Sequence, residues 1–280
     1  MSAIPAARAA RPSAGYYVDR ALVYGLAVFF ALWVLVPFYL IAISAFSPRQ
    51  AVFDYPKPLL PVDLSADTMA FFVNSRGVLP SVVNSLIVAG LTIAVGLALG
   101  APAGYALARF QFRGKDSFSL AVLATKMFPI SILSIPLAVT FLRLGLYDNL
   151  LSVALVHTAI ALPFVILVTS GVFVAVSNEL EEAAQTLGCS RWSAFMRVSL
   201  PLALPGLAAA AIFTFVISWN EVFAATILTL RNRTLPAQVL TTLTDSPLYY
   251  KFAGGLFMVV PAIVFIFFMR RYLLNLWGGR

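Results

Sequence analysis

Long apolar runs without charge restrict this chain more than any other feature of its sequence. The first of them, from Ala21 to Phe46, contains no charged residue. Of the 280 residues, 61% are hydrophobic and 11% are charged, and the mean hydropathy is +0.93. A run of about 18 or more apolar residues is long enough to cross a bilayer as a helix. The sequence therefore predicts an all-α integral membrane protein.

Six transmembrane helices are predicted. They are expected at residues 21–46, within 77–108, and at about 117–142, 150–176, 202–230 and 252–269. The first run is too long for the apolar core of a secretory signal peptide, so we count it as a span. We expect one membrane domain at 21–275, with an N-terminal tail at 1–20 and a C-terminal tail at 276–280.

Lysine and arginine are distributed unevenly between the two sides of the predicted membrane domain. If the N-terminus is cytoplasmic, the cytoplasmic side holds the larger share of the 19 basic residues. An excess of basic residues marks the cytoplasmic side of a membrane protein. We therefore expect both termini in the cytoplasm, together with the polar segment 178–201. Orientation in the bilayer also explains the net charge of +8, and no binding of nucleic acid is predicted.

The polar segment 178–201, between the fourth and fifth predicted spans, is expected to form two short helices. Asn178 and Glu181 have the spacing of a capping box that begins the first helix. Gly188 is expected to end it in a left-handed turn, and Ser190 to cap the second. The first helix carries an apolar stripe on one face, formed by Leu180, Ala183, Ala184 and Leu187. A polar helix pair with such a stripe at a membrane surface is typical of a docking element.

Several polar residues lie inside the predicted spans, where they serve either transport or helix packing. A charge near the centre of a bilayer costs about 2.5–3.5 kcal/mol on insertion scales. Lys126 is therefore expected to face an aqueous path or the bundle interior, or else to snorkel or to pair, for example with Glu221. Trp219, Asn220 and Glu221 form a polar break that either lines a pathway or joins helices by hydrogen bonds. His157 is expected to be a hydrogen-bonded packing residue. A run with GxxxG spacing, Gly96, Gly100 and Gly104, predicts close helix packing.

Soluble-enzyme chemistry is not indicated. The dipeptide Gly114-Lys115 is followed by Asp116 and lacks the earlier glycine of a phosphate-binding loop. No Ser-His-Asp set or carboxylate pair is suggested by the spacing. Cys189 is the only cysteine and His157 the only histidine, which predicts neither a disulfide nor a metal site. We expect no catalytic residue and no cofactor on this chain.

The segment from residue 182 onward resembles the signature of the membrane subunits of bacterial ABC importers. That signature is Glu-Ala-Ala, three residues, Gly, nine residues, and then a hydrophobic residue, any residue, Leu and Pro. Here it reads Glu182-Ala183-Ala184, Gly188 and Val198-Ser199-Leu200-Pro201. The carbohydrate-uptake branch, and in it the smaller permease subunit of maltose-type systems, is similar also at other positions. These are Asn84–Leu86, GYALARF at 104–110, Met127–Pro129 and Trp219–Glu221.

The resemblance, which covers about residues 20 to 275, implies a division of labour. Two permease subunits form the pathway in the bacterial inner membrane, two cytoplasmic ABC ATPases bind ATP and Mg²⁺, and an external binding protein delivers a sugar or a related solute. It implies a contact with the ATPase at Glu182 and a turn at Gly188. The implied ATPase-coupling residues are Glu182, Ala183, Ala184, Gly188, Leu200 and Pro201.

Three alternatives stay open before the structure is considered. A permease of the same family for a non-sugar solute is one. An ion-coupled secondary transporter would need intramembrane acids or inverted repeats, and we find no such repeat. A membrane scaffold would explain the docking segment but not Lys126 or the polar break at Asn220 and Glu221.

Overall fold

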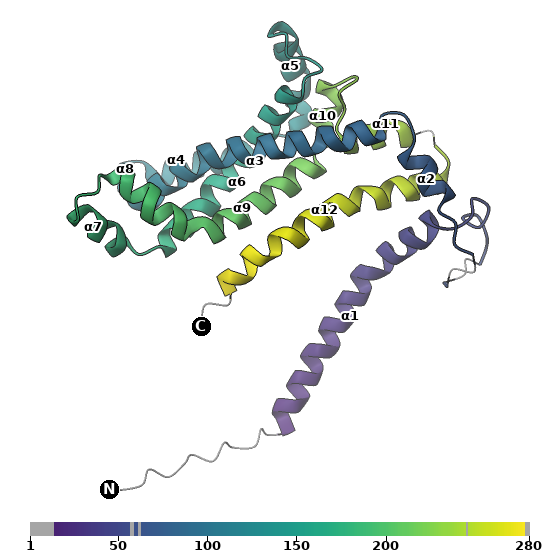
Figure 1. Cartoon of the computed structure of the whole chain (residues 1–280), viewed down its shortest axis with the longest axis horizontal. Coiled ribbons are helices and arrows are strands. Elements are labelled where there is room, and N and C mark those ends of the chain that lie inside the picture. The colour runs from purple at the N-terminus through teal and green to yellow at the C-terminus, as the bar shows by residue number, and fades with distance from the viewer. Residues whose placement is uncertain (1–13, 57–58, 61–62, 245, 278–280) are drawn as a thin grey trace.

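The computed structural model describes residues 14–56, 59–60, 63–244 and 246–277, and every regular element within them is helical (Figure 1). This confirms the predicted all-α fold. Five of the described helices are long and apolar enough to cross a membrane, and a bent helix pair supplies a sixth span if it is counted as one.

The helices follow one another along the described chain without an intervening strand. They are α1 (Ala14–Ala45), α2 (Asp67–Val73), α3 (Val78–Arg109), α4 (Lys115–Ala124), α5 (Ile130–Arg143), α6 (Leu150–Ala175), α7 (Asn178–Thr186), α8 (Arg191–Ala194), α9 (Leu200–Asn220), α10 (Phe223–Leu228), α11 (Leu235–Leu243) and α12 (Leu248–Trp277). A 3-10 turn (Thr125–Met127) follows α4, and a π-helical turn (Phe195–Ser199) precedes α9.

The terminal helices are longer than predicted. Helix α1 begins at Ala14 rather than Ala21, so only residues 1–13 of the expected N-terminal tail lie outside the described residues. Helix α12 extends to Trp277, and residues 278–280 of the expected C-terminal tail lie outside them. Hydropathy locates the apolar part of a span but not its polar ends, because a helix can continue into the aqueous phase.

The third predicted span is not one straight helix. The chain bends by 87° between α4 with its 3-10 turn and α5. Phe128 is extended, with ψ of 114°, and Pro129 precedes the first residue of α5. A residue before proline is driven out of the helical region, and proline has no N–H to continue the ladder. The span predicted at 117–142 is therefore a bent pair of helices and not one continuous helix.

The fifth predicted span also ends early. Helix α9 stops at Asn220, Glu221 is extended, and the short helix α10 starts at Phe223. The carboxylate of Glu221 accepts hydrogen bonds from the backbone N–H groups of Ala224 and Ala225, at 2.9 and 3.2 Å. These bonds satisfy backbone N–H groups in the first turn of α10, which have no partner within the helix. The single span expected at 202–230 is thus two helices.

Helices α3 and α6 form the most extensive helix contact, and glycines set their separation. A Cβ atom on Gly104 would lie 2.7 Å from the backbone nitrogen of Ser170 and 2.9 Å from the carbonyl oxygen of Ile166. Gly100 is equally crowded by Val165, whereas Gly96 has more room. The predicted close packing is confirmed at two of the three glycines of the run.

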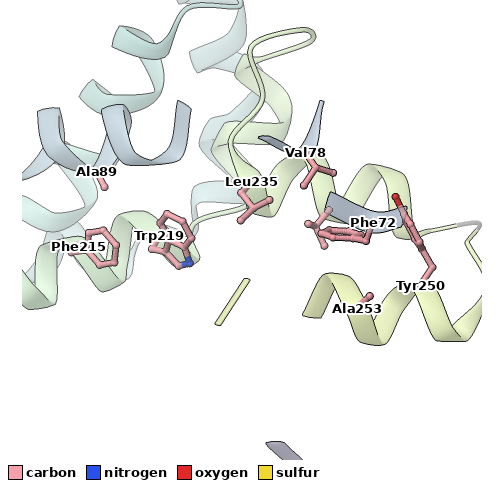
Figure 2. Packing of buried hydrophobic residues seen from close by; sticks show 9 residues of the cluster. Phe72, Val78, Ala89, Phe215, Trp219, Leu235, Tyr250 and Ala253 are labelled. Carbon is pink, nitrogen blue, oxygen red and sulfur yellow. The ribbon is translucent and has the colours of Figure 1, made fainter. Parts of the chain in front are cut away.

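A hydrophobic core involves α2 and α11, which lie at the end of the bundle opposite α7 (Figure 1). Figure 2 shows its labelled members, which come from five helices: Phe72, Val78, Ala89, Phe215, Trp219, Leu235, Tyr250 and Ala253. The indole of Trp219 also donates a hydrogen bond to the carbonyl of Met258, at 3.1 Å. These contacts join α2 and α11 to the membrane helices α3, α9 and α12. Helix α1, by contrast, extends away from the bundle and contacts α12, and most of its apolar side chains are exposed.

Candidate functional site

The candidate site is the segment of α7, α8 and the start of α9. Helix α7 begins after Ser177, whose hydroxyl accepts a hydrogen bond from the backbone N–H of Glu179. Ser177, and not Asn178, is thus the N-cap, and Glu181 does not turn back to complete a capping box. The predicted capping box was wrong because the Glu181 side chain has a stronger set of partners inside the bundle.

The turn at Gly188 has the predicted form. Its φ is +94°, a left-handed conformation that favours glycine. The N–H of Gly188 donates to the carbonyl of Gln185, and that of Cys189 to the carbonyl of Ala184, each at 3.0 Å. Ser190 then accepts a hydrogen bond from the N–H of Ser193, as expected of an N-cap. Two bonded turns therefore separate α7 from the next helix.

The second helix of the predicted pair is not separate from the fifth span. Helix is continuous from Arg191 to Asn220, through α8, the π-helical turn and α9. The N–H of Leu200 bonds to the carbonyl of Phe195 across the wide turn. Pro201 follows and has no N–H to offer to the carbonyl of Arg197, which fits a widened turn at this place. The residues after Ser190 are thus an extension of a membrane helix.

The outer face of α7 is exposed. Leu187 is 88% and Leu180 48% exposed, and Glu182 and Ala183 are exposed with them. The predicted apolar stripe therefore points away from the bundle. In the adjoining helix Trp192 is 66% exposed. Of the other predicted coupling residues, Ala184 and Leu200 are half-buried and Pro201 is exposed.

The inner face of α7 is held by Glu181, a residue that the sequence pattern indicated only as part of a capping box. Its carboxylate accepts hydrogen bonds from the Tyr105 hydroxyl and the Arg109 Nε, each at 2.7 Å, and from the Ser199 hydroxyl. Arg109 also donates to the carbonyls of Phe173 and Val176, both at 2.9 Å. The signal that could have located this cluster is the 104–110 segment, because Tyr105 and Arg109 lie on one helix face at i, i+4.

The partners of Glu181 stabilise the ionised form of its carboxylate. Burial by itself raises the pKa of the Glu181 carboxyl, but the hydrogen bonds from Ser199, Arg109 and Tyr105 and the charge of Arg109 outweigh it. The pKa of Glu181 therefore lies below its ordinary value, and the carboxylate is ionised at neutral pH.

The three predicted pathway residues are not brought together. The ammonium group of Lys126 donates to the carbonyl of Ile160 on α6, so the pairing with Glu221 that was considered from the sequence is absent. Asn220 is exposed, and its amide donates to the carbonyl of Val216 at 2.9 Å. The exposed side chain of Lys126 thus bonds to a carbonyl rather than to an acid.

Glu221 instead belongs to a buried cluster with His157 and Ser218. His157 Nε2 lies 3.0 Å from a Glu221 carboxylate oxygen, and Nδ1 lies 2.9 Å from the Ser218 hydroxyl. His157 is completely buried, which confirms the expected packing role. The order of contacts is that of a hydrolytic triad, which the sequence did not suggest. Ser218 is only 5% exposed, however, and Glu221 also caps α10, so the cluster joins helices rather than presenting a nucleophile.

A further contact that the sequence did not reveal is made by Asp148, in the loop before α6. One carboxylate oxygen accepts hydrogen bonds from three consecutive backbone N–H groups, all at 2.9 Å: Leu230, Arg231 and Asn232. Burial alone raises the pKa of Asp148, but these bonds lower it to a net value below the ordinary one. This carboxylate fixes the loop after α10 to the loop before α6.

The sequence of this chain is similar to those of known membrane proteins. Residues 96–275 match the family described as the inner membrane component of binding-protein-dependent transport systems. The trehalose transport system permease protein SugB of Mycobacterium tuberculosis (strain CDC 1551 / Oshkosh) is 34% identical over 74% of this chain and 81% of that protein. The diacetylchitobiose uptake system permease protein DasC of Streptomyces coelicolor (strain ATCC BAA-471 / A3(2) / M145) is 28% identical over 90% and 94% of the two chains.

The fold is also similar to a solved structure. A chain of a bacterial ABC transporter involved in the import of the acidic polysaccharide alginate superposes with a TM-score of 0.75 at 23% identity, over 94% of this chain and 99% of that one. More than half of the present chain matches the family, and SugB is covered over most of its length. The chain therefore belongs to the family of inner membrane components of binding-protein-dependent transport systems, as a transport subunit and not an enzyme.

Proposed function

We propose that this chain is the permease subunit of an ATP-driven importer, in which it forms half of the pathway for a sugar or sugar-like solute. An external binding protein delivers the solute. Support comes from relatives whose names state trehalose and diacetylchitobiose transport, and from the similar fold of an alginate importer. A permease for a non-sugar solute is the alternative. A binding screen on the cognate external protein distinguishes the two, since sugar binding is expected and its absence would contradict the assignment.

The exposed outer face of α7 is the observation that carries the coupling part of the proposal. Apolar side chains and Glu182 lie together on a polar helix that no other described element covers. A cytoplasmic ABC ATPase, which binds the ATP and Mg²⁺, would cover this face. Glu182 would make a polar contact, Ala183 and Ala184 would allow a close approach, and Gly188 would form the turn. Leu200 and Pro201 would lie at the start of the helix that passes the movement into the membrane.

The continuous helix from Arg191 to Asn220 gives the coupling a physical route. When ATP closes the two ATPases, a displacement of α7 and α8 would be passed along this helix into the membrane bundle. The pathway would then change from cytoplasm-facing to outward-facing. The remaining partners are a second permease subunit, which makes a heterodimer, and the lipid bilayer. No nucleic acid is involved.

In the proposed function, both ends of the described chain would lie on the cytoplasmic side. The Ala14 end of α1 and the Trp277 end of α12 both lie toward the end of the bundle that holds α7 (Figure 1). The distribution of lysine and arginine gives the same orientation.

Among the predicted pathway residues, Lys126 and Asn220 are exposed and remain candidates. Glu221 is already bound by His157 and by α10. Unchanged solute uptake in Lys126→Met would remove that residue from the pathway.

Co-purification of partner subunits tests the function directly. The wild-type chain is expected to elute with a second permease and an ABC ATPase. Glu182→Lys reverses a charge on the outer face of α7 and should reduce the amount of retained ATPase, while the folded chain stays intact. Full retention would argue against a contact at Glu182, and a wild-type chain without any ATPase would contradict the proposed function.

Gly188→Val tests the turn. The substitution is strained because φ is +94°, although nothing lies within 4 Å of the new Cβ atom. It should lower uptake and uncouple ATP hydrolysis from transport. Gly145→Val is the matched control, since Gly145 also has positive φ (+69°) and free space, but lies in the loop before α6. Equal losses in both variants would show that backbone strain, and not the position beside α7, is responsible.

A further inference from the structure

We propose that Glu181, and not its exposed neighbour Glu182, is the positioning residue that fixes the coupling helix α7 to the membrane bundle. The inference rests on the proposed coupling role of α7 and extends it. Glu182 would contact the ATPase, and Glu181 would transmit that contact to the membrane helices through Arg109, Tyr105 and Ser199.

The burial of α7 is the first reason. Glu181 is the only residue of α7 that is buried, with 5% of its surface exposed. The apolar stripe of the helix faces outward. Hydrophobic packing therefore contributes little to the attachment of α7 to the bundle. Adjacent glutamates thus have opposite environments, and a polar residue takes the place of the apolar anchor that an amphipathic helix ordinarily has.

The partners of Glu181 are the second reason. Tyr105 and Arg109 belong to α3, and Ser199 belongs to the π-helical turn that continues into α9. Through Arg109 the network reaches the carbonyls of Phe173 and Val176 at the end of α6. A guanidinium suits this place, because its planar fork can bond a carboxylate and helix-terminal carbonyls together. One buried carboxylate therefore connects α7 with α3, α6 and the start of α9.

Besides this network and its packing against the π-helical turn and α8, α7 is attached by the chain turns at its two ends. The chain enters the helix through Val176 and Ser177, which are extended, and leaves it through the left-handed turn at Gly188. Neither turn by itself fixes the orientation of α7 against the bundle. Without the Glu181 carboxylate, a force on the outer face of α7 would rotate the helix about these turns instead of moving α3, α6 and α9.

The first measurement is independent of any partner subunit. Cys189 is the only cysteine of the chain and is half-buried just beyond α7, so a spin label on it reports the mobility of this segment. Label mobility should rise in full-length Glu181→Gln in lipid nanodiscs, because an amide oxygen cannot accept all three bonds and its NH₂ group faces donors. Glu182→Gln is the matched control and should leave the mobility unchanged. Equal mobility in the Glu181→Gln and wild-type chains would overturn the anchor.

The second measurement uses the assembled importer in proteoliposomes. Glu181→Gln should retain its ATPase but transport about tenfold less solute per ATP hydrolysed, as expected when charge-assisted bonds are lost. Glu181→Asp, which keeps the charge on a shorter side chain, should restore part of this ratio. Glu182→Lys should instead lose ATPase from the complex. An unchanged ratio of transport to hydrolysis in a folded Glu181→Gln complex would overturn the positioning role.

Two outcomes separate this inference from the proposed function. If the wild-type chain binds no ATPase, the proposed function fails, and the label on Cys189 still decides whether Glu181 anchors α7. If Glu181→Gln does not fold, Tyr105→Phe serves as a milder variant, because it removes one hydroxyl donor and keeps the ring. It should raise label mobility by less than a fully disrupted carboxylate would, and no rise would overturn the anchor.

Discussion

The two ends of α9 each lie beside a buried carboxylate, and the two carboxylates are bound differently. At the first end Glu181 pairs with Arg109, a permanently charged partner, and with the hydroxyls of Tyr105 and Ser199. At the other end Glu221 pairs with His157, whose charge depends on protonation, and with backbone N–H groups of α10.

The difference follows from what each carboxylate connects. Glu221 lies next to α9 in sequence and starts the following helix, so backbone donors satisfy most of its acceptor capacity. Glu181 reaches from a surface helix to side chains of α3, far away in sequence. A contact between separate helices needs donors from side chains, and Arg109 supplies them to α6 as well. Both clusters therefore join helices, but the second also shapes the break between α9 and α10.

Arg109→Met should have the largest effect and would sharpen this contrast most. It leaves the Glu181 carboxylate, and two carbonyls of α6, without their main donor. The loss of one partner of a buried ion pair costs about 3–5 kcal/mol. A large fall of the melting temperature in detergent is expected, whereas Arg113→Met in the neighbouring exposed loop should have little effect. Comparable stability of the two variants would mean that the Glu181 cluster joins nothing essential.

Gly104→Ala tests whether the separation of α3 and α6 supports the same cluster. The new methyl group would press on the backbone of α6 near Ser170, and overpacking of this kind costs about 1–3 kcal/mol. Gly90→Ala, at an open position of the same helix, should instead be neutral or slightly stabilising, because alanine favours helix. Opposite signs of the two melting-temperature shifts are the expected result. A Gly104→Ala chain as stable as the wild type would show that α6 yields easily.

Glu221→Gln probes the other end of α9. The amide can still cap α10 with its oxygen, but one bond in the His157 contact is lost, at a cost of about 1–2 kcal/mol. The loss should be smaller than that of Arg109→Met. The exposed Glu182→Gln change, measured in parallel, should stay within about 0.5 kcal/mol. A larger loss for Glu221→Gln than for Arg109→Met would reverse the ranking of the two clusters.

The pH dependence of the Glu181 cluster is the smallest predicted effect. The pKa of Glu181 is lowered in the folded chain, so its stabilisation is fully present above the unfolded pKa of about 4.3 and is lost as pH falls through the folded pKa. The difference in melting temperature between the wild type and Glu181→Gln should be constant from about pH 8 to pH 5 and shrink below about pH 4. A difference that grows on acidification would contradict the lowered pKa.

Most of the fold was predictable, because a bilayer allows few backbone structures. Spans near those of α1, α3, α6 and α12 follow from uncharged apolar length alone. The bend between Phe128 and Pro129 was not predicted as a break, although both residues were noted. Hydropathy depends on composition and not on the direction of a helix, so it does not reveal a bend. A proline disturbs the helix only locally, and its presence does not indicate how far the helix bends. The split of the fifth span was missed because the cap provided by Glu221 requires the chain to fold back.

The candidate site was predictable on one face only. The turn at Gly188, the cap at Ser190 and the exposed stripe with Leu180 and Leu187 follow from local patterns, since each depends on neighbours within one or two turns. The role of Glu181 did not follow, because its nearest pattern was a capping box. The local sequence around Glu181 predicts a cap, because the residues that bind its carboxylate belong to other helices.

The sequence by itself determined that this chain crosses the membrane as helices and carries a polar helix with an exposed face between two spans. Backbone hydrogen bonding in lipid and the period of the helix suffice for that. Only the tertiary structure decided which of two adjacent glutamates lies inside. The close approach of α3 and α6 places Arg109 where it bonds both the end of α6 and Glu181, and a buried carboxylate is stable only beside such donors.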